Sequence, residues 1–362
     1  MNLKRIIFSG GGTGGHIYPA ISIANELISR DGNSEILFIG SKNKMEMRIV
    51  PNYGFKIFGL WISGFNRKNY IKNIFLPLKL IVSLLQSFII IKKFKPNIVI
   101  GTGGYASGPV MYVANLLKIP TLIQEQNSYP GITNKLLCNR VNKICVAYKN
   151  LDKFFPKNKI VLTGNPVRLN ILKNSNLFDD GIEFFDLDSD KKTMLVIGGS
   201  LGSREINKAI YSIKEFFRYN NLQVIWQCGK LYYDEYKQKD ISDDIKLYDF
   251  LDKIDLAYSV ADFIISRAGA SSVSELSIVG KPVIFIPSPN VAENHQLKNS
   301  LAVVKNEGAL LVEEKNIKDL KKMILELNSS SNLRNTLSKN IKKTAYINAT
   351  NDIVDEIKKL LK

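Results

Sequence analysis

Short apolar runs alternate with glycine turns and amphipathic stretches along most of the chain. Runs of about 4–8 apolar residues bounded by turns are typical of strands buried on both faces of a parallel sheet. We expect such strands at residues 5–9, 36–39, 97–100, 120–123, 143–146, 194–197, 223–227, 245–251, 262–266 and 283–286. We expect helices at about 19–29, 110–117, 203–217, 271–279, 294–305, 317–327 and 349–361.

The unit of strand, glycine turn and helix that opens the chain recurs from residue 194 onward. Residues 163–168 (TGNPVR) between the two occurrences place Gly and Pro around a strand end, which is typical of a hinge. The pattern therefore predicts an α/β fold of two doubly wound parallel-sheet domains facing a central cleft.

The stretch from Ser266 to Pro289 reads as strand, turn, helix and second strand. Its helix opens on small residues, so its first backbone N–H groups and positive dipole end suit a phosphate. Glu275, one turn further in, can accept hydrogen bonds from both hydroxyls of a ribose. Ser272 and Glu275 also have the spacing of a capping box, which needs no ligand. The stretch alone leaves both interpretations open.

The first glycine turn, residues 10–16 (GGGTGGH), satisfies the G-x-G-x-x-G pattern between a strand and a helix. The next strand, however, ends in Gly40 and Ser41, where an NAD site has an acidic residue for the ribose. We therefore expect an anion-accepting loop that does not bind NAD. His16 at the end of the turn can be a general base, a hydrogen-bond donor or a residue that starts the helix.

Residues 69–94 are long and apolar, but Pro77 and Lys79 interrupt them and lysines flank them. A membrane-spanning helix needs about 20 cleaner residues. The pattern favours a helix half buried in the protein and half lying on a membrane surface, and an ordinary core helix with solvated lysines is the alternative.

Composition narrows the classes of function. With 362 residues, 45% of them hydrophobic, the chain can form two cores. Three cysteines without CxxC spacing and only two histidines exclude a disulfide framework and a structural zinc site. The net charge of +17 suits an anionic partner, although biased composition also explains part of it. Without dense basic runs among aromatics, we expect no binding to nucleic acid.

Seven motifs in order then carry a resemblance that spans nearly the whole chain, apart from residues 174–192 and the C-terminal tail. The motifs are GGGTGGH (10–16), GTGGYASGP (101–109), QEQN (124–127), TGNPVR (163–168), GGSLGS (198–203), SRAGASSVSE (266–275) and NHQ (294–296). With these motifs the chain resembles the MurG family of peptidoglycan N-acetylglucosaminyltransferases, which belongs to glycosyltransferase family 28.

The resemblance implies a GT-B fold, with residues 1–163 as the acceptor-binding, membrane-associated domain and residues 164–345 as the UDP-sugar-binding domain. The C-terminal helix, residues 346–362, is expected to return to the first domain. The implied reaction is the inverting transfer of N-acetylglucosamine from UDP-N-acetylglucosamine to the C4 hydroxyl of N-acetylmuramic acid in undecaprenyl-diphospho-N-acetylmuramoyl-pentapeptide. A related transferase with another lipid acceptor, such as diacylglycerol, and an inactive sugar-nucleotide-binding or lipid-binding protein remain as alternatives.

The expected partners are this donor, the undecaprenyl-linked acceptor, an anionic membrane surface and other cell-wall synthesis proteins. The expected location is peripheral, on the cytoplasmic face of the inner membrane. Since no Asp-x-Asp pair ends a predicted strand, we expect neither a metal nor another cofactor.

Carried over position by position, the resemblance implies the following site residues. The candidates for proton transfer are His16 and Glu125, since an ordinary imidazole pKa of about 6.5 suits a base near neutral pH. The donor site comprises Thr13, Gly14, Gly15, Asn127, Arg168, Ser200, Leu251, Ala270, Ser271, Ser272, Val273, Ser274, Glu275 and Gln296. Tyr105 and Ser107 lie on the acceptor side. The chain departs from the family at Gln124, where the third motif usually has histidine, so proton transfer must fall to His16 or Glu125.

Overall fold

The computed structural model describes residues 3–65, 73–167, 177–199 and 201–361. Its contacts divide the chain into two compact units. The first unit comprises Met1–Val167 with Tyr346–Lys362, and the second comprises Arg168–Ala345. The boundary expected from the sequence, between residues 163 and 164, lies close to this division.

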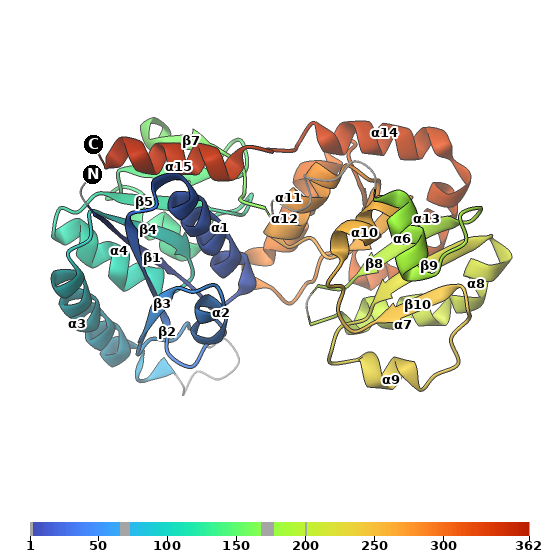
Figure 1. The fold of residues 1–362 in the computed structure, drawn as a ribbon, viewed down its shortest axis with the longest axis horizontal. Helices are drawn as coiled ribbons and strands as arrows, with labels where there is room; N and C mark the ends of the chain where they lie inside the picture. The colour runs from blue at the N-terminus through green and yellow to red at the C-terminus, as the bar shows by residue number, and fades with distance from the viewer. Residues whose placement is uncertain (1–2, 66–72, 168–176, 200, 362) are drawn as a thin grey trace. The chain divides into compact units, whose positions relative to one another are not determined.

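The first unit is built on a parallel sheet in the order β3-β2-β1-β4-β5-β6-β7 (Figure 1). Its strands are β1 (Lys4–Gly10), β2 (Ser34–Ser41), β3 (Lys56–Leu60), β4 (Ile98–Gly103), β5 (Thr121–Glu125), β6 (Lys143–Val146) and β7 (Ile160–Leu162). Its helices are α1 (Gly14–Asp31), α2 (Glu46–Asn52), α3 (Leu76–Phe94), α4 (Ser107–Leu116), α5 (Ile132–Leu137), the short η2 (Lys157–Lys159) and α15 (Ala349–Leu360).

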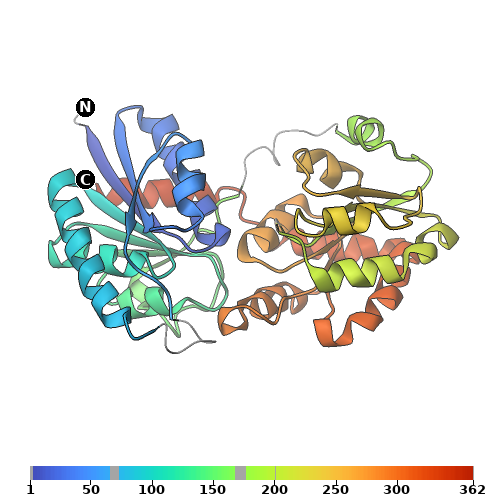
Figure 2. The same ribbon diagram turned by 90° about the horizontal axis from the view of Figure 1, so that it is seen from below.

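Each face of this sheet has its own apolar core, because successive strand residues point to opposite sides. Ile6 and Phe8 of β1 face a core that α1, α2 and α15 complete. Ile7 between them faces the opposite core, which α3, α4 and α5 complete. Figures 1 and 2 show α3 and α4 together on one side of the sheet.

The C-terminal helix α15 belongs to the first unit, although the chain reaches it only after the second. Its Ile353, Val354 and Ile357 are buried in the core that α1 shares. Arg30 of α1 donates to Asp355 at 2.7 Å, which adds a polar contact to the same surface.

The second unit repeats the design with a parallel sheet in the order β10-β9-β8-β11-β12-β13. Its strands are β8 (Lys192–Ile197), β9 (Leu222–Gln227), β10 (Ile245–Tyr248), β11 (Phe263–Ser266), β12 (Val283–Phe285) and β13 (Leu310–Leu311). Its helices are α6 (Phe178–Phe185), α7 (Arg204–Ser212), α8 (Lys214–Tyr219), α9 (Tyr233–Lys237), α10 (Ile254–Val260), α11 (Ala270–Val279), η4 (Ala292–Asn294), α12 (His295–Val304), η5 (Glu314–Asp319), α13 (Leu320–Ser329) and α14 (Ser331–Lys342).

Three predicted segments differ from the observed elements. α1 begins at Gly14, a full turn before the predicted start, so Pro19 lies inside the helix and His16 in its first turn. The predicted helix 203–217 is split at Ile213 into α7 and α8. Residues 174–192, predicted to be a polar surface excursion, contain α6, whose Phe185 is buried in the core of the second unit.

Candidate functional site

In the first unit, the two glycine loops meet where the strand order reverses. β1 pairs with β2 on one side and with β4 on the other, and Gly10 of β1 lies opposite Gly103 of β4. At such a switch point the connections leave toward opposite faces of the sheet and open a crevice at the carboxyl ends of the strands. This crevice is the expected ligand position of a doubly wound sheet.

His16 lies at this crevice, half-buried in the first turn of α1. The Thr102 hydroxyl donates to the His16 carbonyl oxygen at 2.8 Å. The imidazole lies against Gly103, where an added Cβ would stand 2.9 Å from ring atoms Cε1 and Nδ1. The φ of +96° at Gly103 also requires glycine. The second glycine motif thus makes room for the histidine of the first.

A carboxylate of the chain itself accepts a hydrogen bond from a backbone amide of the first glycine loop. Glu46 is fully buried, and its Oε2 accepts from the Gly12 N–H at 3.1 Å while its Oε1 accepts from the Ser41 N–H at 2.9 Å. A Cβ at Gly11 or Gly40 would collide with this side chain. The loop therefore holds an internal anion at Gly12, where the sequence predicted an amide open to a ligand.

Tyr105 and Ser107 follow the second glycine loop and differ in accessibility. Tyr105 is half-buried beside the first loop, and burial, then the charge of Glu46, raises its pKa, so the phenol stays protonated. Ser107 is buried, and its hydroxyl donates to Gly104 O at 2.9 Å. The Ser107 side chain thus shapes the turn.

Glu125 is buried beneath the loop that follows β5. Its Oε1 accepts from the backbone N–H and the Nδ2 of Asn127, at 3.0 and 3.2 Å. Its Oε2 accepts from the Gly131 N–H at 3.1 Å and from Asn134 Nδ2 at 2.8 Å. A carboxylate has about four acceptor positions, and these four donors fill them. The geometry makes Glu125 the anchor of residues 127–134.

Gln124, which stands where the family usually has histidine, is fully buried in this unit. Its Nε2 donates to Asn165 Oδ1 at 2.9 Å, and its Oε1 accepts from Gln126 Nε2. The side chain is engaged in a buried amide network and has no surface at which it could meet a substrate.

The remaining residues predicted for the first unit open α1. Thr13 is exposed at its N-cap position and makes no side-chain capping bond, and Gly14 and Gly15 are half-buried in the first turn. These residues lie within one turn of His16.

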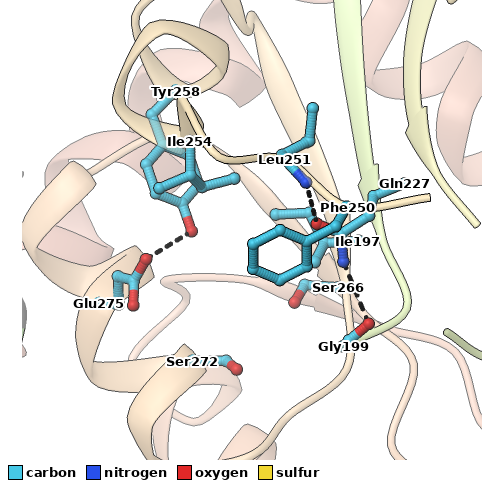
Figure 3. Close-up of a pocket in the computed structure, with 10 residues that line it drawn as sticks. All are labelled: Ile197, Gly199, Gln227, Phe250, Leu251, Ile254, Tyr258, Ser266, Ser272 and Glu275. Carbon is cyan, nitrogen blue, oxygen red and sulfur yellow. Dashed lines mark hydrogen bonds between the residues drawn. The ribbon is translucent and has the colours of Figure 1, made fainter. Parts of the chain in front are cut away.

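The second unit has its own switch point between β8 and β11, and a pocket lies there (Figure 3). The pocket encloses about 120 Å³, several times the share of one water molecule, which suits one ring of a ligand rather than a whole sugar nucleotide. Its lining residues are Ile197, Gly199, Gln227, Phe250, Leu251, Ile254, Tyr258, Ser266, Ser272 and Glu275.

Glu275 lines this pocket from α11, and the capping-box alternative is wrong. The helix begins at Ala270 after Gly269 as N-cap, and no side chain caps it, so Ser272 lies inside the helix. The Glu275 Oε1 instead accepts from the Tyr258 hydroxyl at 2.9 Å (Figure 3). The carboxylate is thus oriented toward the pocket by a partner from another helix.

Leu251 lies on the opposite wall, buried and joined to the glycine turn after β8 by one side chain. Gln227 accepts from the Leu251 N–H at 3.1 Å and donates to Gly199 O at 3.1 Å (Figure 3). Gln227 thereby connects the two loops that border the pocket.

The other predicted donor residues are placed as follows. Ala270 and Val273 are buried, so their backbone is the part that can reach a ligand. Ser271 and Ser274 are half-buried, and the Ser271 hydroxyl finds no hydrogen-bond partner within the described ranges. Gln296 accepts from the Ser288 N–H at 2.9 Å.

Arg168 and Ser200, predicted to approach the diphosphate, lie outside the described residues. Sequence reasoning also missed Glu46, Gln126, Gln227 and Tyr258. The glycines at positions 11 and 40 leave the space that Glu46 fills, but this is visible only in the structure.

Comparisons with known proteins agree with this architecture. Residues 6–146 match the glycosyltransferase family 28 N-terminal domain, and residues 193–356 match its C-terminal domain. A relative from Flavobacterium psychrophilum is 55% identical over 100% of this chain and 99% of its own length. A second from Christiangramia forsetii is 52% identical over 99% and 98%. Both are named "UDP-N-acetylglucosamine--N-acetylmuramyl-(pentapeptide) pyrophosphoryl-undecaprenol N-acetylglucosamine transferase".

Among solved structures, that of Acinetobacter baumannii MurG is similar, with a TM-score of 0.80 at 26% identity. The match covers 98% of this chain and 99% of that one. Both domain models match in order, together over most of the chain, and the two relatives match at more than half identity over almost its full length. This chain belongs to glycosyltransferase family 28.

Proposed function

We propose that this chain transfers N-acetylglucosamine from UDP-N-acetylglucosamine to the C4 hydroxyl of N-acetylmuramic acid in undecaprenyl-diphospho-N-acetylmuramoyl-pentapeptide. The observation that carries this function is the identity of 55% and 52%, over almost the full length, with relatives named for that transfer. The chain is a UDP-N-acetylglucosamine-dependent glycosyltransferase of peptidoglycan synthesis.

The donor nucleotide is assigned to the pocket of the second unit. The uracil ring lies against Phe250 and Leu251, and the ribose hydroxyls donate to Glu275 on the facing helix. The volume of the pocket suits the uracil ring, and the position of Glu275 on the pocket wall suits the ribose. Gln227, which already joins the base-side loop to Gly199, keeps the base and phosphate subsites in register.

In the transfer, the acceptor hydroxyl oxygen attacks the anomeric carbon while the bond from that carbon to the diphosphate oxygen breaks. UDP leaves with the electron pair, and attack from the opposite face converts the α-linked donor into a β-1,4 product. The hydroxyl proton passes to His16. We prefer His16 to Glu125 as the base because the four acceptor positions of Glu125 are already filled by Asn127, Gly131 and Asn134.

The departing diphosphate gains negative charge, and groups of the second unit with partial positive charge can stabilise it. The first N–H groups of α11 have no intrahelical partner by position, and its dipole is positive at that end. Together with the backbone at Gly199, they stabilise the leaving group as its charge develops. Ser200 and Arg168, which lie outside the described residues, are expected from the resemblance to add to this stabilisation.

An acceptor-dependent assay tests the function. With UDP-N-acetylglucosamine and a soluble analogue of the lipid-linked N-acetylmuramoyl-pentapeptide, we expect UDP release and a product heavier by one N-acetylglucosamine. Turnover with diacylglycerol alone would reassign the acceptor. Donor binding without turnover on either acceptor would make the chain a binding protein.

The helix α3 supports a membrane-associated location. A surface helix ordinarily turns its apolar residues toward the core. On α3 the fully buried residues are Ser83, Ser87 and Ile91. The hydroxyls of both serines donate to backbone carbonyl oxygens of the same helix. Large apolar side chains are exposed on and just before the helix: Ile74, Phe75, Leu78, Leu80, Ile81, Leu85, Phe88 and Ile89. Leu84, Ile90 and Phe94 also pack against the core, so α3 carries apolar residues on its outer face in addition to its core face. This second, exposed apolar face argues against the alternative of an ordinary core helix.

The apolar face continues onto the strand at the edge of the sheet and has basic residues at one end. Phe58 of β3 and Trp61 after it are exposed, and the Trp61 N–H donates to Gln86 of α3 at 2.9 Å. Lys92, Lys93 and Lys95 are exposed at the end of the helix, whereas Lys68 and Lys72 lie outside the described residues. No helix within the described ranges is long and apolar enough to cross a membrane. We infer peripheral binding of this face to an anionic membrane, on the cytoplasmic side where the nucleotide donor is made.

A further inference from the structure

The ring of His16 has one close polar neighbour whose orientation can be decided. Its Nδ1 lies 3.1 Å from Oε1 of Gln126. A carboxamide can be turned end for end, so the surroundings of Gln126 Nε2 decide which atom faces the ring. That nitrogen donates to Thr102 O at 2.8 Å, to Gln124 O at 3.1 Å and to Gln124 Oε1. All three neighbours are acceptors, so the reversed amide would place oxygen against three oxygens.

The orientation of Gln126 fixes the proton on His16. A carboxamide oxygen only accepts, so the ring nitrogen facing it, Nδ1, must carry the hydrogen. A neutral imidazole has one N–H and one lone pair, and the lone pair is therefore on Nε2. The Cε1 and Nδ1 atoms of the ring also lie against Gly103.

The amide frame that holds Gln126 is buried and closed. Gln124, Gln126 and Asn165 are 0%, 1% and 2% exposed. Gln124 Nε2 donates to Asn165 Oδ1, and Asn165 Nδ2 returns a hydrogen bond to the Gln126 carbonyl oxygen, both at 2.9 Å. Any one of these side chains can turn only if a buried hydrogen bond is lost, which is costly.

We propose that Gln126 is a positioning residue that holds His16 in the Nδ1–H tautomer, so that Nε2 is the nitrogen that takes the proton of the acceptor hydroxyl. The catalytic half of this role rests on the proposed function, whereas the tautomer does not. When Nε2 takes the proton, the imidazolium keeps its Nδ1–H bond to Gln126, and the proton later passes from Nε2 to water. In a catalytic triad a carboxylate accepts from the Nδ1–H of histidine and fixes its tautomer. Gln126 has the same role toward His16 but carries no negative charge.

The tautomer can be observed directly, because the chain has only two histidines. The full chain is labelled with ¹⁵N-histidine, and the His16 signals are identified by their loss in His16→Gln. Above the pH at which His16 becomes neutral, we expect the nitrogen shifts of an Nδ1–H imidazole. We expect Gln126→Met, which keeps the side-chain length and removes the acceptor, to move the ring toward Nε2–H. An Nε2–H ring in the unaltered protein, or no change in Gln126→Met, would overturn the proposal.

Kinetics test whether Gln126 acts through His16. We expect Gln126→Met to lower kcat about tenfold to a hundredfold, less than the roughly 10²–10⁴-fold of losing a general base, because His16 itself remains. We expect the dissociation constant of UDP-N-acetylglucosamine to stay unchanged. In the double variant with His16→Ala, we expect no loss beyond that of His16→Ala alone. Losses that multiply would show that Gln126 acts elsewhere and would overturn the positioning role.

A conservative variant separates this role from a loss of folding. Gln126→Glu keeps the side-chain length and, in either protonation state, an acceptor oxygen toward the His16 Nδ1–H. We expect it to retain more turnover than Gln126→Met at equal melting temperature, and equal turnover of the two would count against the tautomer. The unaltered protein can have the Nδ1–H tautomer while the His16→Ala variant turns over normally. In that case the catalytic half of the proposal fails, and the transfer reaction itself stands.

Discussion

Two side chains on the outer face of α3 offer the sharpest test of membrane association. Leu85 and Ile89 are 60% and 64% exposed. Burial of a whole Leu or Ile side chain gains about 1.5–3 kcal/mol, so insertion of these exposed parts gains about 1–2 kcal/mol each. The double variant Leu85→Ser and Ile89→Ser should therefore lose about 2–4 kcal/mol, which weakens partitioning about thirtyfold to several hundredfold. Because both side chains are exposed, unfolding should change by less than about 0.5 kcal/mol per substitution.

Flotation with vesicles that contain anionic lipid measures the loss of membrane binding. A matched pair of substitutions controls for non-specific binding by exposed apolar side chains. Leu231 and Leu325 of the second unit are 70% and 45% exposed, and serine at both should leave vesicle binding unchanged. Equal binding of the α3 variant and the unaltered chain would refute the assignment of this face. Equal weakening by the two pairs would show that exposed apolar area in general drives the association.

Salt separates the apolar from the electrostatic contribution. Glutamate at Lys92, Lys93 and Lys95 removes about 1 kcal/mol of attraction per lysine at low ionic strength and adds repulsion between the new carboxylates and the anionic lipid. At 1 M salt the Debye length is about 3 Å, so the lysine variant should bind as the unaltered protein does. The serine variant should stay weaker at every salt concentration, since burial of apolar surface is not screened.

Three shorter predictions concern the two units separately. Glu275→Ala should weaken UDP-N-acetylglucosamine binding by about 1.5–3 kcal/mol in calorimetry, the range for hydrogen bonds to a charged group, and an unchanged affinity would place the ribose elsewhere. Arg267 bonds Glu314, Ser203 and Ile286 O inside the second unit, so Arg267→Met should destabilise it by up to about 3 kcal/mol in chemical denaturation. Gly103→Ala should abolish turnover but not donor binding, because its Cβ meets the ring of His16, and an active variant would exclude this crevice from the reaction.

The fold could be predicted because parallel strands buried on both faces read as continuous apolar runs. β1, β4, β8 and β11 lie where those runs stand. Short amphipathic elements escaped prediction for the opposite reason. α6 spans Phe178–Phe185, barely two turns, and the contacts that identify it are tertiary: Phe185 in the core and Gly181 against Val260. Two turns give too few repeats of the helical period to be recognised.

The site was only partly predictable, because its supporting residues have partners that are remote in sequence. The motifs singled out His16 and Glu275 as candidates, because each lies in a helix that follows a turn of small residues. Gln126 meets His16 across 110 positions, and Glu46 meets Gly12 across 34. Neither pairing leaves a periodic or spacing signal, so the Glu46 carboxylate could not be anticipated in the first loop.

The glycines of the two loops in the first unit make room for side chains of the protein, whereas those of a dinucleotide-binding loop make room for a ligand. A motif that resembles a dinucleotide-binding loop therefore need not bind a nucleotide. In a phosphate loop, glycines let a ligand approach the backbone amides. Gly11 instead makes room for Glu46, whose carboxylate takes the Gly12 amide, and Gly103 makes room for the ring of His16. A buried carboxylate on that amide repels a second anion, so the Gly12 N–H is not a site for a phosphate. In this chain the first glycine-rich turn is therefore a loop that an internal side chain already fills at Gly12.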